Sequence, residues 1–204
     1  MIHISGASGS GKTTLGNKLK EHFKGKIVVK DLDNLRSEFE KKRYSNTYNL
    51  EYFDSDGYQA FLDQYILSIK KPLILVGLNH MFWFNKDLYY NVHSTYNFYI
   101  DVDDILIVKQ KCIRFLTDEL PDMVTKNESI IRDITEDNQK FVRLIKENIE
   151  RECGTKETLK LNRMWKKDYK KQGYTFMSRE DIYKSIVTIL NKTLPRKKTQ
   201  KKRK

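Results

Sequence analysis

Short apolar runs alternate with longer amphipathic stretches along this chain. The apolar runs are rich in β-branched and aromatic residues, which predicts strands. A run without polar interruptions, such as Leu73–Val76, is typical of a parallel strand that is buried on both faces. The predicted strands cover residues 1–5, 26–30, 73–76, 96–102 and 174–177.

Apolar residues at helical spacing predict helices between these strands. Residues 33–43 show the pattern weakly. The helix that follows Asp103 should end before Pro121, because proline interrupts a helix. Ser178 and Asp181 predict a capped start for the last helix. The clearer helical segments are 13–23, 58–71, 103–120 and the stretch after residue 178.

Strands that alternate with helices imply right-handed crossovers. We therefore expect an α/β fold, a three-layer sandwich with a five-stranded parallel sheet, over residues 1–191. The stretches 44–57 and 79–93 are expected to be irregular. Residues 122–172 are strongly charged and helical in pattern, without a strand candidate, and form the candidate lid.

The net charge of +12 changes this picture mainly at one end of the chain. Residues 192–204 contribute eight Lys or Arg and no acid, which leaves +4 for the rest. Such a segment repels itself and stays solvated. It could contact nucleic acid non-specifically, act as a nuclear address or only increase solubility, and the sequence leaves these alternatives open.

The remaining composition indicates a cytoplasmic protein, with a nuclear location possible through the basic tail. No apolar run approaches the length of a membrane span, so we expect no membrane partner. The chain starts with Met1-Ile2-His3-Ile4 and shows no signal-peptide pattern. Cys112 and Cys153 lack metal-ligand spacing and are expected to be reduced thiols.

The most specific motif is a glycine-rich loop between the first strand and the first helix. It fits G-x-x-x-x-G-K-[ST] at every position. Its backbone N–H groups can surround phosphate oxygens, and the helix that follows directs its positive end at them. Lys12 can reach the β- and γ-phosphates of ATP, and the Thr13 hydroxyl can ligate Mg²⁺. The predicted nucleotide-binding residues are Gly6, Ala7, Ser8, Gly9, Ser10, Gly11, Lys12, Thr13 and Thr14.

Two other classes of protein with this loop fit less well. A GTPase should carry Asn-Lys-x-Asp, which Asn85-Lys86-Asp87-Leu88 misses by one position. Asp54-Ser55-Asp56-Gly57 fits D-x-x-G, but no predicted strand precedes it. A motor-type ATPase should have acids after a later strand, whereas residues 77–80 are Gly-Leu-Asn-His. The absent base-reading motif favours ATP over GTP.

The loop close to Met1, followed by Asp31-Leu32-Asp33 after the second strand, resembles the nucleoside-monophosphate-kinase-like superfamily, in particular its adenylate-kinase and shikimate-kinase-like group. The resemblance implies that Asp31 lies near Mg²⁺ and that Asp33 contacts the acceptor, where it could act as a base. It places Arg36 on the acceptor side. Carboxylates at the carboxyl ends of parallel strands fit this chemistry, although Asp33 could equally cap the next helix.

The resemblance also implies arginines over the transferring phosphate. The candidate cations are Lys111 and Arg114 on the helix after the fourth strand, then Arg132, Arg143 and Arg151 in the lid. Arg114 is the preferred catalytic candidate, and Arg132 and Arg143 would contact the substrate. The chain departs from the family pattern after the third strand, which lacks an acid. Asn79 or His80 could replace it, or Asp31 could hold Mg²⁺ alone. The mainly aromatic cluster at 81–84, together with Tyr89 and Tyr90, could stack on a planar acceptor or pack the loop against the sheet.

The sequence therefore predicts an ATP- and Mg²⁺-dependent phosphotransferase that acts on a small hydroxyl or phosphate acceptor, with nucleosides and nucleotides slightly favoured. Two alternatives stay open. The basic tail would suit a kinase that acts on polynucleotide ends, and the missing acid after the third strand would suit a nucleotide-binding switch without turnover.

Overall fold

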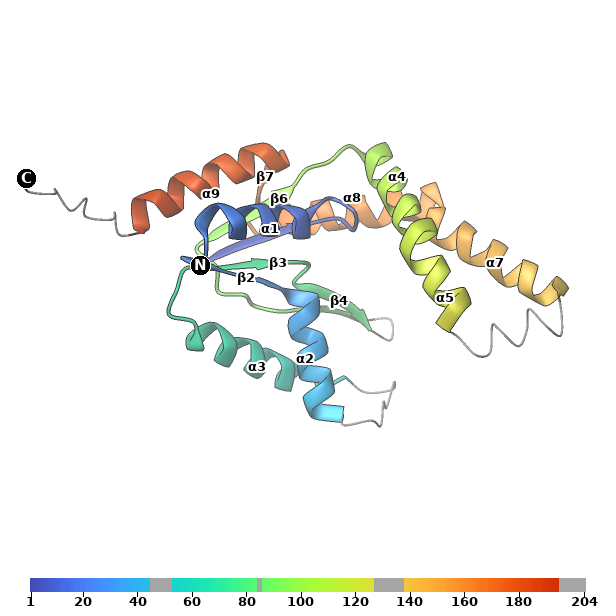
Figure 1. Ribbon diagram of the computed structural model, residues 1–204, viewed down its shortest axis with the longest axis horizontal. Coiled ribbons are helices and arrows are strands. Elements are labelled where there is room, and N and C mark those ends of the chain that lie inside the picture. The colour runs from blue at the N-terminus through green and yellow to red at the C-terminus, as the bar shows by residue number, and fades with distance from the viewer. Residues whose placement is uncertain (45–52, 84–85, 127–137, 195–204) are drawn as a thin grey trace, which may run out of the picture. The chain divides into compact units, whose positions relative to one another are not determined.

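The computed structural model describes most of the chain, and the chain divides into two compact units (Figure 1). The described residues are 1–44, 53–83, 86–126 and 138–194. The first unit comprises residues 1–5, 12–100 and 175–204, and the second comprises residues 6–11 and 101–174.

A five-stranded parallel sheet forms the centre of the first unit. Its spatial order is β2-β3-β1-β6-β7. Strand β3 pairs in parallel with both β2 and β1, and β6 pairs in parallel with β7. The expected α/β fold with five parallel strands is thus confirmed. The strands are β1 (Ile2–Gly6), β2 (Val28–Asp31), β3 (Leu73–Val76), β6 (Tyr96–Ile100) and β7 (Thr175–Met177).

Helices pack on both faces of this sheet because β3 is apolar on both sides. Leu73 and Leu75 join a buried cluster with residues of α2 and α3. On the other face, Gly16 of α1 lies so close that a Cβ there would be 3.0 Å from Val29 Cγ1 and 3.2 Å from Val76 Cγ1. The helices of this unit are α1 (Lys12–Phe23), α2 (Leu32–Tyr44), α3 (Ser55–Ser68) and α9 (Arg179–Thr193).

The last helix begins as predicted. The Ser178 hydroxyl accepts a hydrogen bond from the Asp181 backbone N–H at 3.1 Å. Ile182, Ile186 and Leu190 supply the buried side of α9. The helix runs beside α1, where the Tyr183 hydroxyl and His22 Nδ1 are 3.0 Å apart.

The expectation of an irregular segment at 79–93 was wrong. Residues His80–Trp83 form β4 and Lys86–Tyr89 form β5, which pair as an antiparallel hairpin. Aromatic residues favour extended, half-buried backbone, so the composition that suggested a loop also suits strands.

Helix α3 starts earlier than predicted, inside the stretch 44–57 that was expected to be a loop. Asp54 is its N-cap, and its side chain accepts a hydrogen bond from the Gly57 backbone N–H at 2.8 Å. A Cβ on Gly57 would lie 2.2 Å from Asp54 Oδ2. The D-x-x-G pattern at residues 54–57 therefore marks the start of a helix. The rest of the expected loop, residues 45–52, lies outside the described residues.

The second unit is helical apart from the loop 6–11, as far as it is described. The helical backbone that begins with α4 does not stop before Pro121 as predicted but continues to Lys126. A π-helical turn, Phe115–Glu119, follows α4, and Leu120 N–H bonds to Phe115 O. This wider turn precedes Pro121, which sits at the second position of α5, where its missing N–H is not needed. The helices are α4 (Asp104–Arg114), α5 (Leu120–Lys126), α7 (Asn138–Cys153) and α8 (Thr155–Lys171).

A polar network joins α8 to the start of α4. Lys166 Nζ lies 2.8 Å from Asp101 Oδ1 and 3.5 Å from Asp104 Oδ1. Burial lowers the pKa of Lys166, but the bond and charge of Asp101, supported by Asp104, outweigh it and raise the pKa. Asn162 Nδ2 also donates to Asp104. The two helices are therefore held together at this end by charge-assisted hydrogen bonds.

The structure bears on the membrane expectation only through helix length and polarity. Within the described residues, none of the helices combines the length and apolar character that a membrane span requires.

His3 gives the first unit a testable dependence on pH. It is fully buried in β1, and its Nε2 lies 3.0 Å from Gly77 O, so Nε2–H donates to that carbonyl. Burial lowers the pKa of His3 from 6.5 to about 4; the bond to Gly77 opposes this and the charge of Lys12 adds to it. Between these values the unfolded chain binds more protons than the folded one, so stability falls as pH falls.

We expect the unfolding free energy of wild type to fall by about 3 kcal/mol more between pH 6.5 and 4 than that of a His3→Asn or His3→Gln variant. The figure follows from about 1.4 kcal/mol per unit of pKa shift. Urea unfolding at a series of pH values measures both proteins. Parallel stability curves would show that His3 does not carry this dependence.

Candidate functional site

The glycine-rich loop has the backbone that its sequence predicts. Gly9 and Gly11 adopt φ angles of 80° and 84°, in the left-handed region that glycine tolerates best. Ser10 N–H bonds to Ala7 O at 3.1 Å and closes a tight turn. The loop joins β1 directly to α1, so the strand–loop–helix context that gives this motif its meaning is present.

Thr13 and Asp31 meet in the first unit. Thr13 lies in the first turn of α1, and its hydroxyl donates to Asp31 Oδ2 at 3.1 Å. The other oxygen of Asp31 accepts from Asp33 N–H at 2.9 Å, which caps the start of α2. The carboxylate is thus fixed in orientation, with one oxygen directed at the first turn of α1.

The oxygens of Thr13 and Asp31 fit a magnesium ion. Mg²⁺ prefers oxygen ligands and is usually bound through one or two carboxylates together with substrate phosphates. No cluster of three or more His, Cys, Asp or Glu side chains suited to a metal occurs in the described parts of the chain. A site with one carboxylate and one hydroxyl is therefore what these residues could offer to a phosphate-bound ion.

Asp33 lies on the first turn of α2 and pairs with Arg36. Their Oδ1 and Nη2 atoms are 3.0 Å apart, and the Asp33 side chain is 66% exposed. Arg36 is also within 4.0 Å of Glu40 Oε1 and is only 30% exposed. Asp33 does not cap the helix, since Asp31 does, so its carboxylate stays accessible from solvent. The structure thus brings the predicted acceptor-side pair together.

Tyr90, from the predicted aromatic cluster, and Tyr58, which no motif singled out, both lie near enough to Arg36 for its charge to act on them. Tyr58 donates to Leu32 O at 3.3 Å, and the rings of Tyr58 and Tyr90 pack edge to face with centroids 4.7 Å apart. Burial raises the pKa of Tyr90 to about 12, although the charge of Arg36 opposes it. The Tyr90 hydroxyl is buried and has no hydrogen-bond partner within the described residues. It is therefore a protonated donor close to the acceptor-side pair.

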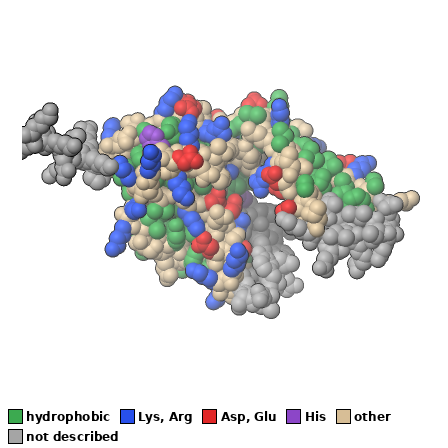
Figure 2. Space-filling model, in the orientation of Figure 1, with side chains coloured by type: hydrophobic (Ala, Val, Ile, Leu, Met, Phe, Trp, Pro, Cys, Tyr) green, Lys and Arg blue, Asp and Glu red, His purple; other side chains and the backbone are tan. Residues whose placement is uncertain are grey.

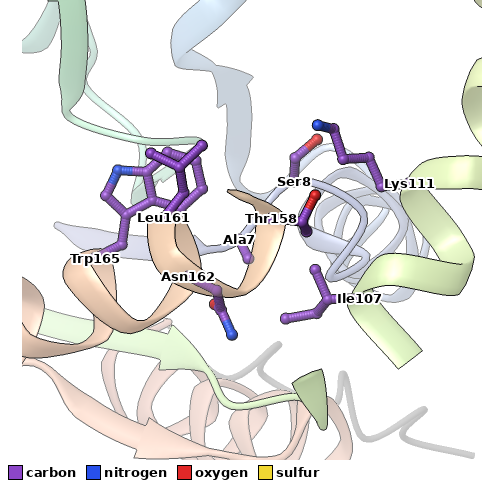
Figure 3. A pocket seen from close by; sticks show the side chains of 8 residues that line it. All are labelled: Ala7, Ser8, Ile107, Lys111, Thr158, Leu161, Asn162 and Trp165. Carbon is purple, nitrogen blue, oxygen red and sulfur yellow. The ribbon is translucent and has the colours of Figure 1, made fainter. Parts of the chain in front are cut away.

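In the second unit the loop packs against α4. A Cβ on Gly9 would lie 3.2 Å from Gln110 Cβ and 3.5 Å from Lys111 N. A pocket of about 30 Å³ lies nearby and is lined by loop, α4 and α8 residues (Figure 3). This volume suits one or two water molecules rather than a nucleobase. The lining residues are Ala7, Ser8, Ile107, Lys111, Thr158, Leu161, Asn162 and Trp165.

The predicted cations have different surroundings. Arg114 pairs with Glu119, with Nε and Oε1 3.0 Å apart. Arg143 is exposed on α7, and Arg132 lies outside the described residues. On α4 it is Lys111 that lies at the loop, with its amine on the same side of the pocket as the Ser8 hydroxyl (Figure 3). Lys111 was a sequence candidate, but spacing could not rank it above Arg114, because the contact depends on how α4 packs on the loop.

The residues after β3 serve the fold. Asn79 Nδ2 donates to Tyr90 O at 2.9 Å, and Tyr90 N–H donates to Asn79 O at 2.8 Å. His80 is buried in β4 and packs against the ring of Tyr89. Both side chains close the base of the hairpin.

No protein-family model matches this chain, and no curated protein sequence matches it. A function must therefore be argued from the motif and the geometry.

The packing of the loop on α4 can be tested with matched glycines. Gly9 and Gly173 both have φ of 80° and both belong to the second unit, but a Cβ on Gly173 would meet nothing within 4 Å. Gly173→Ala should cost about 1–2 kcal/mol of unfolding free energy from backbone strain alone. Gly9→Ala should cost more, because its methyl group also presses on Gln110.

Denaturant unfolding of the two variants and wild type measures this difference. Equal destabilisation by the two substitutions would contradict the contact between the loop and α4.

Proposed function

We propose that this protein is an ATP- and Mg²⁺-dependent phosphotransferase that moves the γ-phosphate to a small hydroxyl or phosphate acceptor. The observation that carries the proposal is the hydroxyl of Thr13 set 3.1 Å from the carboxylate of Asp31, at the end of a complete phosphate-loop motif. A parallel α/β sheet supports it, because ligands of such sheets bind at the carboxyl ends of the strands.

The residues divide into donor-side and metal-side roles. Backbone N–H groups of Gly6–Gly11 would bind the phosphates, and Lys12 would offset negative charge as it passes to the leaving group. Thr13 and Asp31 would hold Mg²⁺, which neutralises phosphate charge and orients the terminal phosphoryl group. Asp31 stays oriented for this because Asp33 N–H fixes its second oxygen.

Asp33 and Arg36 are the proposed acceptor-side residues. A carboxylate there could accept the proton of an attacking hydroxyl, and the guanidinium could orient an anionic or polar acceptor. The protonated Tyr90 hydroxyl adds a donor beside them. Nucleosides carry sugar hydroxyls and a polar base, and nucleotides add an anionic phosphate, so these are the acceptors that we favour.

A phosphate-transfer screen tests the proposal. Purified protein, Mg²⁺ and labelled ATP would be incubated with pools of nucleosides, nucleotides, small hydroxyl metabolites and 5′-hydroxyl oligonucleotides. We expect transfer to one of the small-molecule pools. Lys12→Ala should lower it by about 10²–10³-fold, as expected when a group that stabilises developing charge is removed. Lys20→Ala, an exposed lysine on the same helix, should leave the rate unchanged.

Equal rates for Lys12→Ala and wild type would refute the assignment of the loop. Transfer only to oligonucleotides would favour a polynucleotide-end kinase. Tight ATP binding without transfer to any pool would favour the nucleotide switch.

Asp31 and Asp33 should be separable by their dependence on Mg²⁺. Asp31→Asn removes a metal ligand, so we expect the Mg²⁺ concentration for half-maximal transfer to rise. Asp33→Asn removes the proposed base, so we expect kcat to fall about 10²–10⁴-fold with the Mg²⁺ dependence unchanged. Asp56→Asn, at an exposed site in α3, serves as the charge-matched control.

Steady-state rates over a Mg²⁺ titration measure both effects. A raised Mg²⁺ requirement in Asp33→Asn, or none in Asp31→Asn, would reverse or remove the assigned roles.

A further inference from the structure

Arg36 of α2 is held between two carboxylates. Its Nη2 atom lies 3.0 Å from Asp33 Oδ1, and its Nε atom lies 4.0 Å from Glu40 Oε1. Within the described residues, Arg36 is the cation that pairs with these two acids, and no second Lys or Arg joins them. One positive charge therefore lies between two negative charges, and the group has a net negative charge. We call these three residues the α2 triad.

The charges of the α2 triad are only partly screened by water. The side chain of Glu40 is 16% exposed, and that of Arg36 is partly buried as well. Figure 2 shows Asp and Glu side chains among Lys and Arg side chains where Figure 1 draws α2, so this surface is of mixed sign. Charges in partly buried positions interact more strongly than charges in bulk water. An anion that approached Arg36 would therefore also meet the field of both carboxylates.

A phosphate group would have to compete with these carboxylates for the guanidinium. Arginine recognises a phosphate with two parallel N–H bonds from its planar fork. On Arg36, Nη2 is directed at Asp33 and Nε faces Glu40, so a phosphate could use the fork only by displacing a carboxylate. The displaced carboxylate would then lie beside the phosphate, and like charges side by side are strongly disfavoured.

An uncharged compound with hydroxyl groups fits the same site without this conflict. A hydroxyl can donate to a carboxylate and also accept from a guanidinium or a phenol. Tyr90 supplies such a phenol: it is 7% exposed, and its hydroxyl has no hydrogen-bond partner in the described part of the chain. The charges of Arg36 and Glu40 both act on this hydroxyl. A buried donor without a partner is unfavourable, and a hydroxyl oxygen of a ligand would give it one.

We propose that the α2 triad and Tyr90 bind an uncharged compound with several hydroxyl groups, such as a nucleoside or a sugar, in preference to its phosphate ester. The inference rests on the proposed function, and it narrows the acceptor from hydroxyl or phosphate compounds to uncharged hydroxyl compounds. Arg36 then positions the Asp33 carboxylate and contacts a hydroxyl, rather than neutralising a phosphate.

The transfer step is a displacement at the γ-phosphorus of ATP. The acceptor hydroxyl oxygen forms a bond to that phosphorus, and the bond from the phosphorus to the β–γ bridging oxygen breaks. ADP leaves with the electron pair of the broken bond, and the hydroxyl proton passes to the Asp33 carboxylate. The products are a phosphate monoester, ADP and one proton, which Asp33 can release to solvent because its side chain is exposed.

The test compares acceptors that differ by one phosphate group. The pairs are adenosine, cytidine, guanosine and uridine with their 5′-monophosphates, and ribose and glycerol with ribose 5-phosphate and glycerol 3-phosphate. Transfer from labelled ATP gives kcat/KM for each compound. Isothermal titration calorimetry with Mg²⁺ and a non-hydrolysable ATP analogue measures binding without turnover. We expect the uncharged member of at least one pair to be preferred by about 10–10²-fold.

Glu40→Gln should reduce this preference, because the α2 triad then has no net charge and Arg36 is released from one carboxylate. We expect the preference to narrow by about 3–10-fold, as for the loss of one partly buried charge. Glu38→Gln is the matched control, since Glu38 lies on the same helix but pairs with Lys30. It should leave the preference unchanged.

Tyr58→Phe and Tyr90→Phe separate binding from folding. The Tyr58 hydroxyl donates to Leu32 O at 3.3 Å, so its loss should lower Tm and leave the preference unchanged. Tyr90→Phe removes a hydroxyl without such a bond, so we expect Tm to be retained. The KM of the uncharged acceptor should rise about 3–10-fold with kcat unchanged. An unchanged KM in Tyr90→Phe would remove Tyr90 from the site.

The outcomes separate this inference from the proposed function. Transfer to the phosphate esters at rates equal to or above those of their uncharged partners would overturn the inference and leave the phosphotransferase intact. Preferential binding of an uncharged compound without transfer would support the inference and count against the phosphotransferase. Binding of neither member of any pair, or a wild-type preference in Glu40→Gln, would overturn the inference.

Discussion

Strand β3 is the constraint on which the first unit depends. It is four residues long, it is buried on both faces, and it pairs with β2 on one side and β1 on the other. A parallel neighbour on each side requires that the chain return across the sheet between strands, and helices make those returns. The positions of α1, α2 and α3 all follow from this, as does the meeting of the first turn of α1 with the end of β2.

The elements that sequence could predict are those whose signal is local. Continuous apolar runs revealed the five parallel strands, and Ser178 with Asp181 revealed the start of α9. The hairpin was missed because its strands are joined by Phe84-Asn85, which lacks the glycine that usually marks a two-residue turn. The start of α3 was missed because Asp54 also fits a loop motif. The helix was wrongly expected to end before Pro121. A π-helical turn lies immediately before this proline, so the helical backbone continues although Pro121 has no N–H to donate.

In the candidate site, too, contacts between residues with a local sequence signal could be predicted, and contacts that depend on packing could not. Asp33 and Arg36 are three positions apart, so helical spacing alone predicts their contact. The sequence could also place Thr13 and Asp31 in one site. Thr13 ends the phosphate-loop motif, Asp31 ends a parallel strand, and both positions lie at the carboxyl edge of the sheet. Tyr58 and Tyr90 near Arg36, and Lys111 near the loop, depend on packing between segments that are distant along the chain. Such contacts leave no periodic pattern in the sequence, which therefore offered both Lys111 and Arg114 on this helix without showing which of them lies at the loop.

The close approach of α1 to the sheet has a consequence for ligand binding. Gly16 allows the helix backbone to rest on Val29 and Val76, at a distance that a larger residue would not permit. That packing is already complete in the protein alone, and it holds the Thr13 hydroxyl beside Asp31. The site is thus preorganised at this point. A ligand that uses both oxygens meets them in place and loses less conformational entropy on binding than one that must assemble them.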